Sequence, residues 1–269
     1  MPAQKKNLSF DEASAARMAS TEGATISLAD AIRSASPDVL AAASDPTLTE
    51  DLALALLKRS DLPTQALDQL SKNSGVMTSR KVRLAVVEHP RTPRHVSIPM
   101  VRHLFTFDLM QVALTPVVPA DLKMAAEESL INRLEKIPQG ERLSLAHRAS
   151  RRVVGALLLD PEPRVIHTAL ENSRLTESVV IKALMGRDTT AALVAAVCHD
   201  PKWSLRREIR VALLRNEKTP VTPAREFARS LPGALLREIL HNSRLPEVIK
   251  TCLLRDVTER SGHSAESDF

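Results

Sequence analysis

The fold is decided by three stretches of similar sequence: ALENSRLTESV (169–179), ALLRNEKTP (212–220) and ILHNSRLPEV (239–248). In each stretch an apolar segment runs into an Asn, and four residues later comes a Thr or Pro that can begin a helix: Asn172–Thr176, Asn216–Pro220 and Asn242–Pro246. Asn ends helices because it tolerates the left-handed backbone conformation and hydrogen-bonds locally in turns. Each stretch therefore predicts the end of one helix and the start of the next.

Polar residues of this kind, called anchors below, recur along the chain with regular spacing. From position 160 to position 216 they follow one another at steps of 12, 16, 12 and 16. The anchors are Asp61, Asn73, His89, Thr115, Ser144, Asp160, Asn172, Asp188, Asp200, Asn216 and Asn242. Because two steps make one period, this spacing predicts a repeating unit of two short helices in about 26–28 residues.

Helix starts are marked by Pro. Thr92-Pro93, Asp160-Pro161 and Asp200-Pro201 each place an N-capping side chain before a residue that has no N–H to leave unpaired. With so many starts and stops, most helices should run for about 8–14 residues.

One helix pair of this size cannot bury its apolar face, but stacked pairs bury a continuous core. We therefore expect an all-α fold, specifically a right-handed α-solenoid of short antiparallel helix pairs; the alternative is an irregular helical bundle. The expected organisation is a flexible tail over residues 1–25, a single solenoid domain over 26–259 and a second flexible tail over 260–269.

Over roughly residues 40–259 the chain resembles the HEAT-like and leucine-rich-repeat-variant class of bacterial α-solenoids. The three Asn junctions quoted above carry this resemblance. LLLDPEPRVIHTALENSRLTESVV (157–180) and HDPKWSLRRE (199–208) are also similar to uncharacterised bacterial solenoid proteins. The resemblance implies an architecture rather than a chemistry. An iron–sulfur cluster found in the repeat-variant class needs a cysteine cluster, and this chain has only Cys198 and Cys252.

Composition argues against several function classes. Five Phe, one Trp, no Tyr and seven Gly leave little for aromatic stacking platforms or Gly-rich phosphate loops. No nucleophile-elbow, Walker A or zinc-protease motif occurs, and the adjacent Cys198, His199 and Asp200 do not face one ligand on a helix. We expect no enzyme activity, no cofactor and no metal. Two cysteines and apolar runs too short to span a bilayer favour a reducing, cytoplasmic setting without membrane contact.

Charge is distributed unevenly. The formal net charge is +5, yet residues 1–135 carry 15 Lys and Arg against 16 Asp and Glu, whereas residues 136–269 carry 22 against 16. A basic half of this kind is the electrostatic footprint of a phosphate backbone or of an acidic partner.

Residues 28 apart should lie at equivalent places on neighbouring units, so three pairs of cations predict ladders across the repeats: Arg174 with Lys202, Lys182 with Arg210, and Arg187 with Arg215. Trp203 can share a helical face with Arg206 and Arg207, either as an exposed anchor or as a cover for a repeat junction. The candidate residues for binding a partner or phosphate are Arg148, Arg151, Arg152, Arg174, Lys182, Arg187, Lys202, Trp203, Arg206, Arg207, Arg210 and Arg215.

Three functions follow as hypotheses. The first is a non-enzymatic interaction scaffold that binds a protein partner on its concave or basic face. The second is nucleic-acid binding through the basic C-terminal half, in the manner of HEAT-like DNA-binding proteins, which would weaken steeply with salt. The third is a subunit of a larger assembly, whose near-neutral and basic halves could meet between copies.

Overall fold

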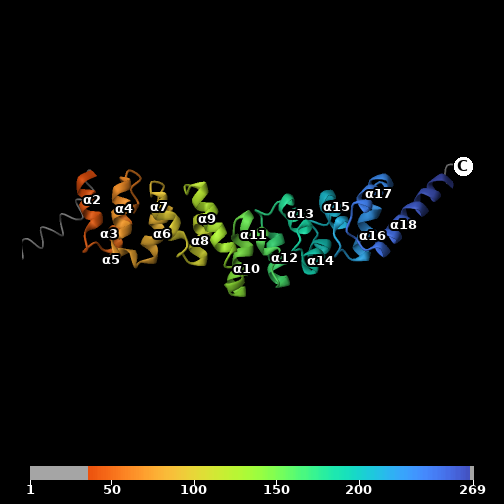
Figure 1. The fold of residues 1–269 in the computed structure, drawn as a ribbon, viewed down its shortest axis with the longest axis horizontal. Coiled ribbons are helices and arrows are strands. Elements are labelled where there is room, and N and C mark those ends of the chain that lie inside the picture. The colour runs from red at the N-terminus through yellow and green to blue at the C-terminus, as the bar shows by residue number, and fades with distance from the viewer. Residues whose placement is uncertain (1–35, 267–269) are drawn as a thin grey trace, which may run out of the picture. The chain divides into compact units, whose positions relative to one another are not determined.

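The computed structural model describes residues 36–266, with side-chain burial described from Val39 to Glu259. This part of the chain contains seventeen α-helices and one 3-10 turn, and it contains no strand (Figure 1). The predicted all-α class is confirmed. The N-terminal tail predicted for residues 1–25 lies outside the described residues.

The chain divides into two compact units, one ending at Ser129 and the other beginning at Leu130. Each unit is described by itself below. The single solenoid domain expected over residues 26–259 stays a prediction.

The first unit holds eight helices within the residues that the structure describes, and the last of them runs just past the boundary. They are α2 (Ser36–Ser44), α3 (Glu50–Leu57), α4 (Thr64–Lys72), α5 (Ser74–Met77), α6 (Arg80–Glu88), α7 (Arg94–Val101), α8 (Thr106–Leu114) and α9 (Ala120–Ile131).

In the first unit, helices α2 to α6 each contact a helix further along the chain. Helix α2 packs on α4, α3 packs on α6, and α6 contacts α5, α7 and α8. The core between them is aliphatic, with Leu56, Leu67, Leu70, Val82 and Val86 fully buried. Apolar residues at positions three and four apart supply this core because they fall on one face of each short helix.

The second unit holds the 3-10 turn and the remaining nine helices. They are η1 (Leu134–Lys136), α10 (Gln139–Arg148), α11 (Arg151–Leu157), α12 (Pro163–Glu171), α13 (Glu177–Met185), α14 (Ala191–His199), α15 (Arg207–Arg215), α16 (Val221–Arg229), α17 (Gly233–His241) and α18 (Glu247–Glu266). Helices α12 to α17 have 9 residues each, as short as the sequence predicts. Helix α18, however, has 20 residues and continues into the segment predicted as a C-terminal tail.

Helices of the second unit pack in two interleaved series. In one, α10 contacts α12 and α12 contacts α14; in the other, α11 contacts α13, α13 contacts α15 and α15 contacts α17. Contacts also join neighbours along the chain, such as α10 with α11 and α15 with α16. The residues buried between them include Leu157, Ile166, Leu170 and Leu213.

Most anchors lie where helices end. Asn73, His89, Thr115, Asn172, Asp200, Asn216 and Asn242 are the C-cap residues of their helices. Asp160 and Asp188 follow the C-caps Leu158 and Gly186 at the second position. Ser144 was expected to be an anchor, but it lies inside α10, where its hydroxyl donates to the Gly140 carbonyl at 3.1 Å.

The conformation of the anchors differs from the expectation. No residue with a positive φ occurs in the part of the chain that the structure describes, and caps such as Asn172 (φ −60°, ψ 128°) have extended backbone. Apart from Asn242, the anchors that cap helices therefore turn the chain into an extended segment, and their side chains hydrogen-bond to nearby backbone groups. The prediction that the anchors adopt the left-handed backbone conformation is therefore wrong.

The predicted N-caps before Pro are also wrong. The N-cap of α7 is Pro93 itself, that of α12 is Glu162, and that of α15 is Arg206. The polar residues instead bind neighbouring groups: the Thr92 hydroxyl donates to the Val86 carbonyl at 2.6 Å, and Asp160 accepts the Glu162 N–H at 2.9 Å.

Candidate functional site

A hydrogen-bonded junction clamp ties the end of α12 to α10. The buried Asn172 donates from Nδ2 to the Ala146 carbonyl at 2.8 Å and accepts the Arg174 N–H on Oδ1 at 2.8 Å. The Arg174 guanidinium then donates to the Arg148 carbonyl at 3.0 Å. Arg174, predicted as a binding residue, therefore holds the turn after α12 against the end of α10.

The same junction clamp ties α15 to α13. Asn216 Nδ2 donates to the Leu184 carbonyl at 2.5 Å, and Asn216 Oδ1 accepts the Lys218 N–H at 2.8 Å. Lys218 reaches back with its ammonium group to the Thr189 carbonyl at 2.6 Å. The sequence analysis found the anchor Asn216 but missed the basic residue two positions later that completes the clamp.

In the first unit His89 takes the place of the Asn. The Arg91 N–H donates to His89 Nδ1 at 3.3 Å, so we assign the ring proton to Nε2, which lies 2.9 Å from the Arg59 carbonyl. The Arg91 guanidinium donates to the Asp61 carbonyl at 3.0 Å. Three clamps thus share one chemistry, an anchor followed after two residues by a cation.

Trp203 covers a junction between repeats and is not an exposed binding residue. Its side chain is 1% exposed, and its Nε1 donates to the Leu170 carbonyl at 2.9 Å. The Lys202 ammonium lies 4.4 Å from the ring centroid, and the Arg206 guanidinium lies 5.2 Å from it. Arg206 also pairs with Glu177 at 3.0 Å. These two cations are engaged in the fold through the indole ring.

Two of the three predicted ladders are out of register. Helix α13 begins at Glu177 and α15 begins at Arg207, so Lys182 corresponds to Ala212 rather than to Arg210. The predicted partners therefore differ by two helical positions, about 200° around the helix axis. Arg210 accordingly donates to the Ser204 carbonyl at 2.7 Å and lies over the Phe227 ring. Lys182 lies instead on an exposed groove.

The pair Arg174 and Lys202 keeps its register, because the two residues stand equally far from the starts of α12 and α14. Each backbone N–H donates to the anchor two residues earlier, at 2.8 Å in both cases. Their side chains nevertheless differ, since Arg174 binds a carbonyl and Lys202 lies over Trp203.

A groove of about 470 Å³ lies between α11 and α13. Its walls are mostly apolar and its charged residues are three cations and one carboxylate. The lining residues are Arg151, Arg152, Gly155, Ala156, Leu159, Val179, Lys182, Ala183, Gly186 and Asp188. The helices approach closely at Gly155, where an added Cβ would lie 2.7 Å from Val179 Cγ1. The sequence analysis named the cations but missed the apolar floor, because its residues come from two helices.

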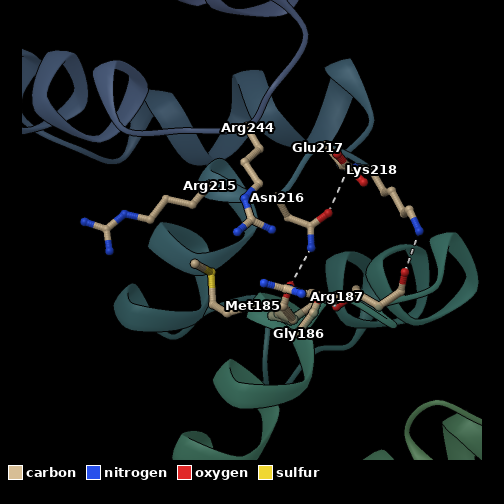
Figure 2. A pocket seen from close by; sticks show the side chains of 10 residues that line it. Met185, Gly186, Arg187, Arg215, Asn216, Glu217, Lys218 and Arg244 are labelled. Carbon is tan, nitrogen blue, oxygen red and sulfur yellow. Dashed lines mark hydrogen bonds between the residues drawn. The ribbon is translucent and has the colours of Figure 1, made fainter.

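A smaller cavity, called the junction pocket below, has a volume of about 30 Å³ and lies where α13, α15 and α17 end. Its lining includes four cations, Arg187, Arg215, Lys218 and Arg244, and one carboxylate, Glu217. Figure 2 shows the guanidinium groups of Arg187 and Arg244 turned toward the Asn216 amide, whereas Arg215 extends away from them. Lys218 and Arg244 are cations that the sequence analysis did not select.

The remaining predicted residues lie on the surface of the second unit. Arg148, Arg151, Arg152 and Arg207 are all exposed. The side chains of four of these cations form no hydrogen bond or ion pair among the described residues, so their charges face solvent: Arg151, Lys182, Arg187 and Arg207. Arg151 and Lys182 meet at the groove, but Arg148 and Arg207 line none of the cavities described above.

Within residues 36–266 no three His, Cys, Asp or Glu side chains are grouped to hold a metal ion, and no helix is long and apolar enough to cross a membrane. Burial raises the pKa of the Cys198 thiol to about 11, which keeps it protonated and unreactive at neutral pH. The arrangement is suited to binding: an apolar groove with a cationic rim and a small cationic pocket. Comparison of the chain with protein-family models, curated proteins and solved structures gives no match.

Proposed function

We propose that this protein is a non-enzymatic interaction scaffold of the α-solenoid type, and that the groove between α11 and α13 binds an acidic segment of a protein partner around one apolar side chain. The proposal keeps the cytoplasmic location and the HEAT-like resemblance inferred from the sequence. The groove's combination of an apolar floor with two cations that have no counter-ion among the described residues, Arg151 and Lys182, is the observation that carries it.

Support for the solenoid comes from the packing inside each unit. Helices contact the second helix along the chain as well as the next one, which is how stacked helix pairs pack. The junction clamps at Asn172, His89 and Asn216 bridge positions 26, 30 and 32 apart, close to one repeat. A scaffold needs such rigid units because its binding surface is assembled from several of them.

The groove's size and chemistry favour a peptide. About 470 Å³ is within the range of small-ligand sites, enough for a large aliphatic or aromatic side chain. Arg151 and Lys182 have no counter-ion among the described residues, so Asp or Glu beside the apolar anchor would neutralise them.

A phosphodiester backbone fits the groove less well. Nucleic-acid surfaces place cations in rows that follow the phosphates, and the register between α13 and α15 breaks the row formed by Lys182 and Arg210. The groove floor also carries no aromatic ring on which a base could stack.

A peptide-display selection on the full chain tests the proposal. We expect enrichment of peptides with one large apolar residue flanked by Asp or Glu. The double variant Arg151→Glu with Lys182→Glu should weaken the selected peptide at least about tenfold, since two attractive charges become repulsive. Arg164→Glu is the matched control, because Arg164 is exposed on α12 and lines none of the cavities described above.

A second variant tests the apolar floor without changing charge. Ala156 is half-buried and lines the groove, so Ala156→Leu should fill part of it and weaken the same peptide. Enrichment of basic or uncharged peptides, or binding that both groove variants leave unchanged, would overturn the assignment. So would tight binding of a mixed-sequence duplex that weakens by orders of magnitude between about 50 and 200 mM salt, because that is the signature of phosphate-backbone contacts.

A further inference from the structure

Arg244 occupies the place of a clamp residue but forms no clamp. Asn242-Ser243-Arg244 repeats the residues of Asn172-Ser173-Arg174, whose Arg is tied to a carbonyl of the preceding repeat. Arg244 instead lines the junction pocket, and its side chain has no hydrogen-bond partner among the described residues. The same local sequence is thus used for a different purpose at this junction.

The backbone explains the difference. Asn172 and Asn216 leave their helices with extended backbone, at ψ 128° and 130°, whereas Asn242 has φ −96° and ψ 11°. Asn242 Nδ2 is directed to the Glu238 carbonyl of its own helix at 3.4 Å, and the Arg244 N–H donates to the Arg215 carbonyl at 3.0 Å. The turn is therefore held through the main chain of Arg244, and the Arg244 guanidinium remains available to line the pocket.

Two guanidinium groups, those of Arg187 and Arg244, lie close to the Asn216 amide in this small space (Figure 2). Arg187 and Arg244 carry unpaired guanidinium groups among the described residues, and Lys218 brings an ammonium that one carbonyl binds without neutralising. With Arg215 the lining holds four cations against one carboxylate, Glu217, which is a formal excess of three positive charges. Gathering like charges costs free energy, so a bound anion that offsets this excess would be held strongly.

Charge and size together select the anion. A volume of about 30 Å³ has room for one small group only, so a base or sugar attached to the anion would lie outside the pocket. Guanidinium groups bind phosphate oxygens in a bidentate manner, and a phosphate monoester carries close to two negative charges at neutral pH. A phosphodiester carries one charge and would leave two of the three excess positive charges without a counter-charge.

We propose that the junction pocket is a binding site for a phosphate monoester group or inorganic phosphate, held by Arg187 and Arg244 with Lys218 contributing charge. This site does not depend on the proposed groove function. The peptides used to test the groove carry no phosphate, so the two proposals can fail separately.

Isothermal titration of the full chain with inorganic phosphate at pH 8 and constant ionic strength tests the site, with chloride as the balancing anion. We expect saturable binding to one site. Arg187→Gln and Arg244→Gln should each weaken it at least about tenfold, since each removes a positive charge and its charge-assisted hydrogen bonds to the anion. Arg237→Gln removes an exposed Arg on α17 outside the pocket and should leave the affinity unchanged.

Further ligands identify the source of the group. Phosphoserine binding at least as tightly as inorganic phosphate would support a site for a group carried by a partner, and binding of inorganic phosphate alone would support a site for the free ion. Dimethyl phosphate or acetate binding equally well would overturn the monoester assignment. Undetectable binding of phosphate, or binding that Arg237→Gln weakens as much as Arg187→Gln and Arg244→Gln, would overturn the site itself.

Discussion

Replacing the buried Asn216 with Ala should destabilise the chain more than replacing the exposed Asn242 with Ala. Asn216 is 7% exposed and uses both ends of its amide, with Nδ2 donating to the Leu184 carbonyl and Oδ1 accepting the Lys218 N–H. Ala can make neither bond. The substitution therefore removes the centre of this junction clamp while preserving the neighbouring helices.

The expected cost follows from the two groups left behind. Leu184 is 1% exposed, and without Asn216 its carbonyl keeps only the Thr189 hydroxyl at 3.1 Å. That hydroxyl lies nearer to the Ala183 and Gly186 carbonyls and has one proton to donate, so the poorly paired Leu184 carbonyl should cost about 1–3 kcal/mol. Lys218 is exposed, so water can replace the partner of its N–H, and the loss there should be about 0.5–1.5 kcal/mol. Together the free energy of unfolding should fall by about 2–4 kcal/mol.

Asn242→Ala supplies a matched control in the same chain. Asn242 is exposed, and its amide makes one long bond, 3.4 Å, to the Glu238 carbonyl within α17. Its removal should cost less than about 0.5 kcal/mol, as for other surface substitutions.

Urea unfolding followed by tryptophan fluorescence measures the difference. Trp203 is the chain's single Trp, it is buried, and it lies in the second unit, as the clamp does. With a denaturant slope of about 2 kcal/mol per M, the middle of the usual range for urea, Asn216→Ala should lower the midpoint by about 1–2 M. If the two Ala variants unfold within about 0.5 kcal/mol of each other, the clamp contributes no more than a surface bond and the reasoning is refuted.

Three shorter predictions follow. Gly155→Ala should destabilise the chain by about 1 kcal/mol through its clash with Val179, yet stabilise a Val179→Ala background by a similar amount, because helical Ala is favoured over Gly; a double-mutant cycle measures both. Arg225 lowers the pKa of Asp256 by hydrogen-bonding to its carboxylate. The pair therefore contributes to the free energy of unfolding above the ordinary Asp pKa, and this contribution is lost as pH falls through the lowered pKa of the folded state. Unfolding curves in acid should accordingly show a smaller destabilisation by Arg225→Gln than curves at neutral pH. Cys198, with its pKa raised to about 11, should alkylate at pH 8 at least about tenfold more slowly than a free cysteine peptide; equal rates would mean that it is accessible.

Local patterns predicted the helices well because a short helix is largely specified by its own residues. The ends at Asn73, His89, Asn172 and Asn216 follow from polar side chains that compete for backbone groups after an apolar run. The repeat length follows from the same residues only approximately, because the interval from α13 to α15 is two positions longer than the interval from α12 to α14.

The candidate site was predicted only in part. Arg151 and Lys182 were selected for their charge and do line one groove, but Arg174 proved to be a clamp residue and Trp203 a buried junction cover. An Arg in a clamp and an Arg in a pocket look alike in sequence. Their roles differ because the Asn two positions earlier has a different ψ angle, extended at Asn172 and near zero at Asn242.

The amino-acid sequence by itself determined the all-α class, the short helices, their ends and the basic character of the second half, because periodicity, capping chemistry and charge are properties of neighbouring residues. Tertiary structure alone decided which cations face solvent. Two extra residues between α13 and α15 rotate Arg210 and Arg215 away from Lys182 and Arg187. Such a rotation depends on how helices from different repeats pack against one another, and no local stretch of sequence encodes it.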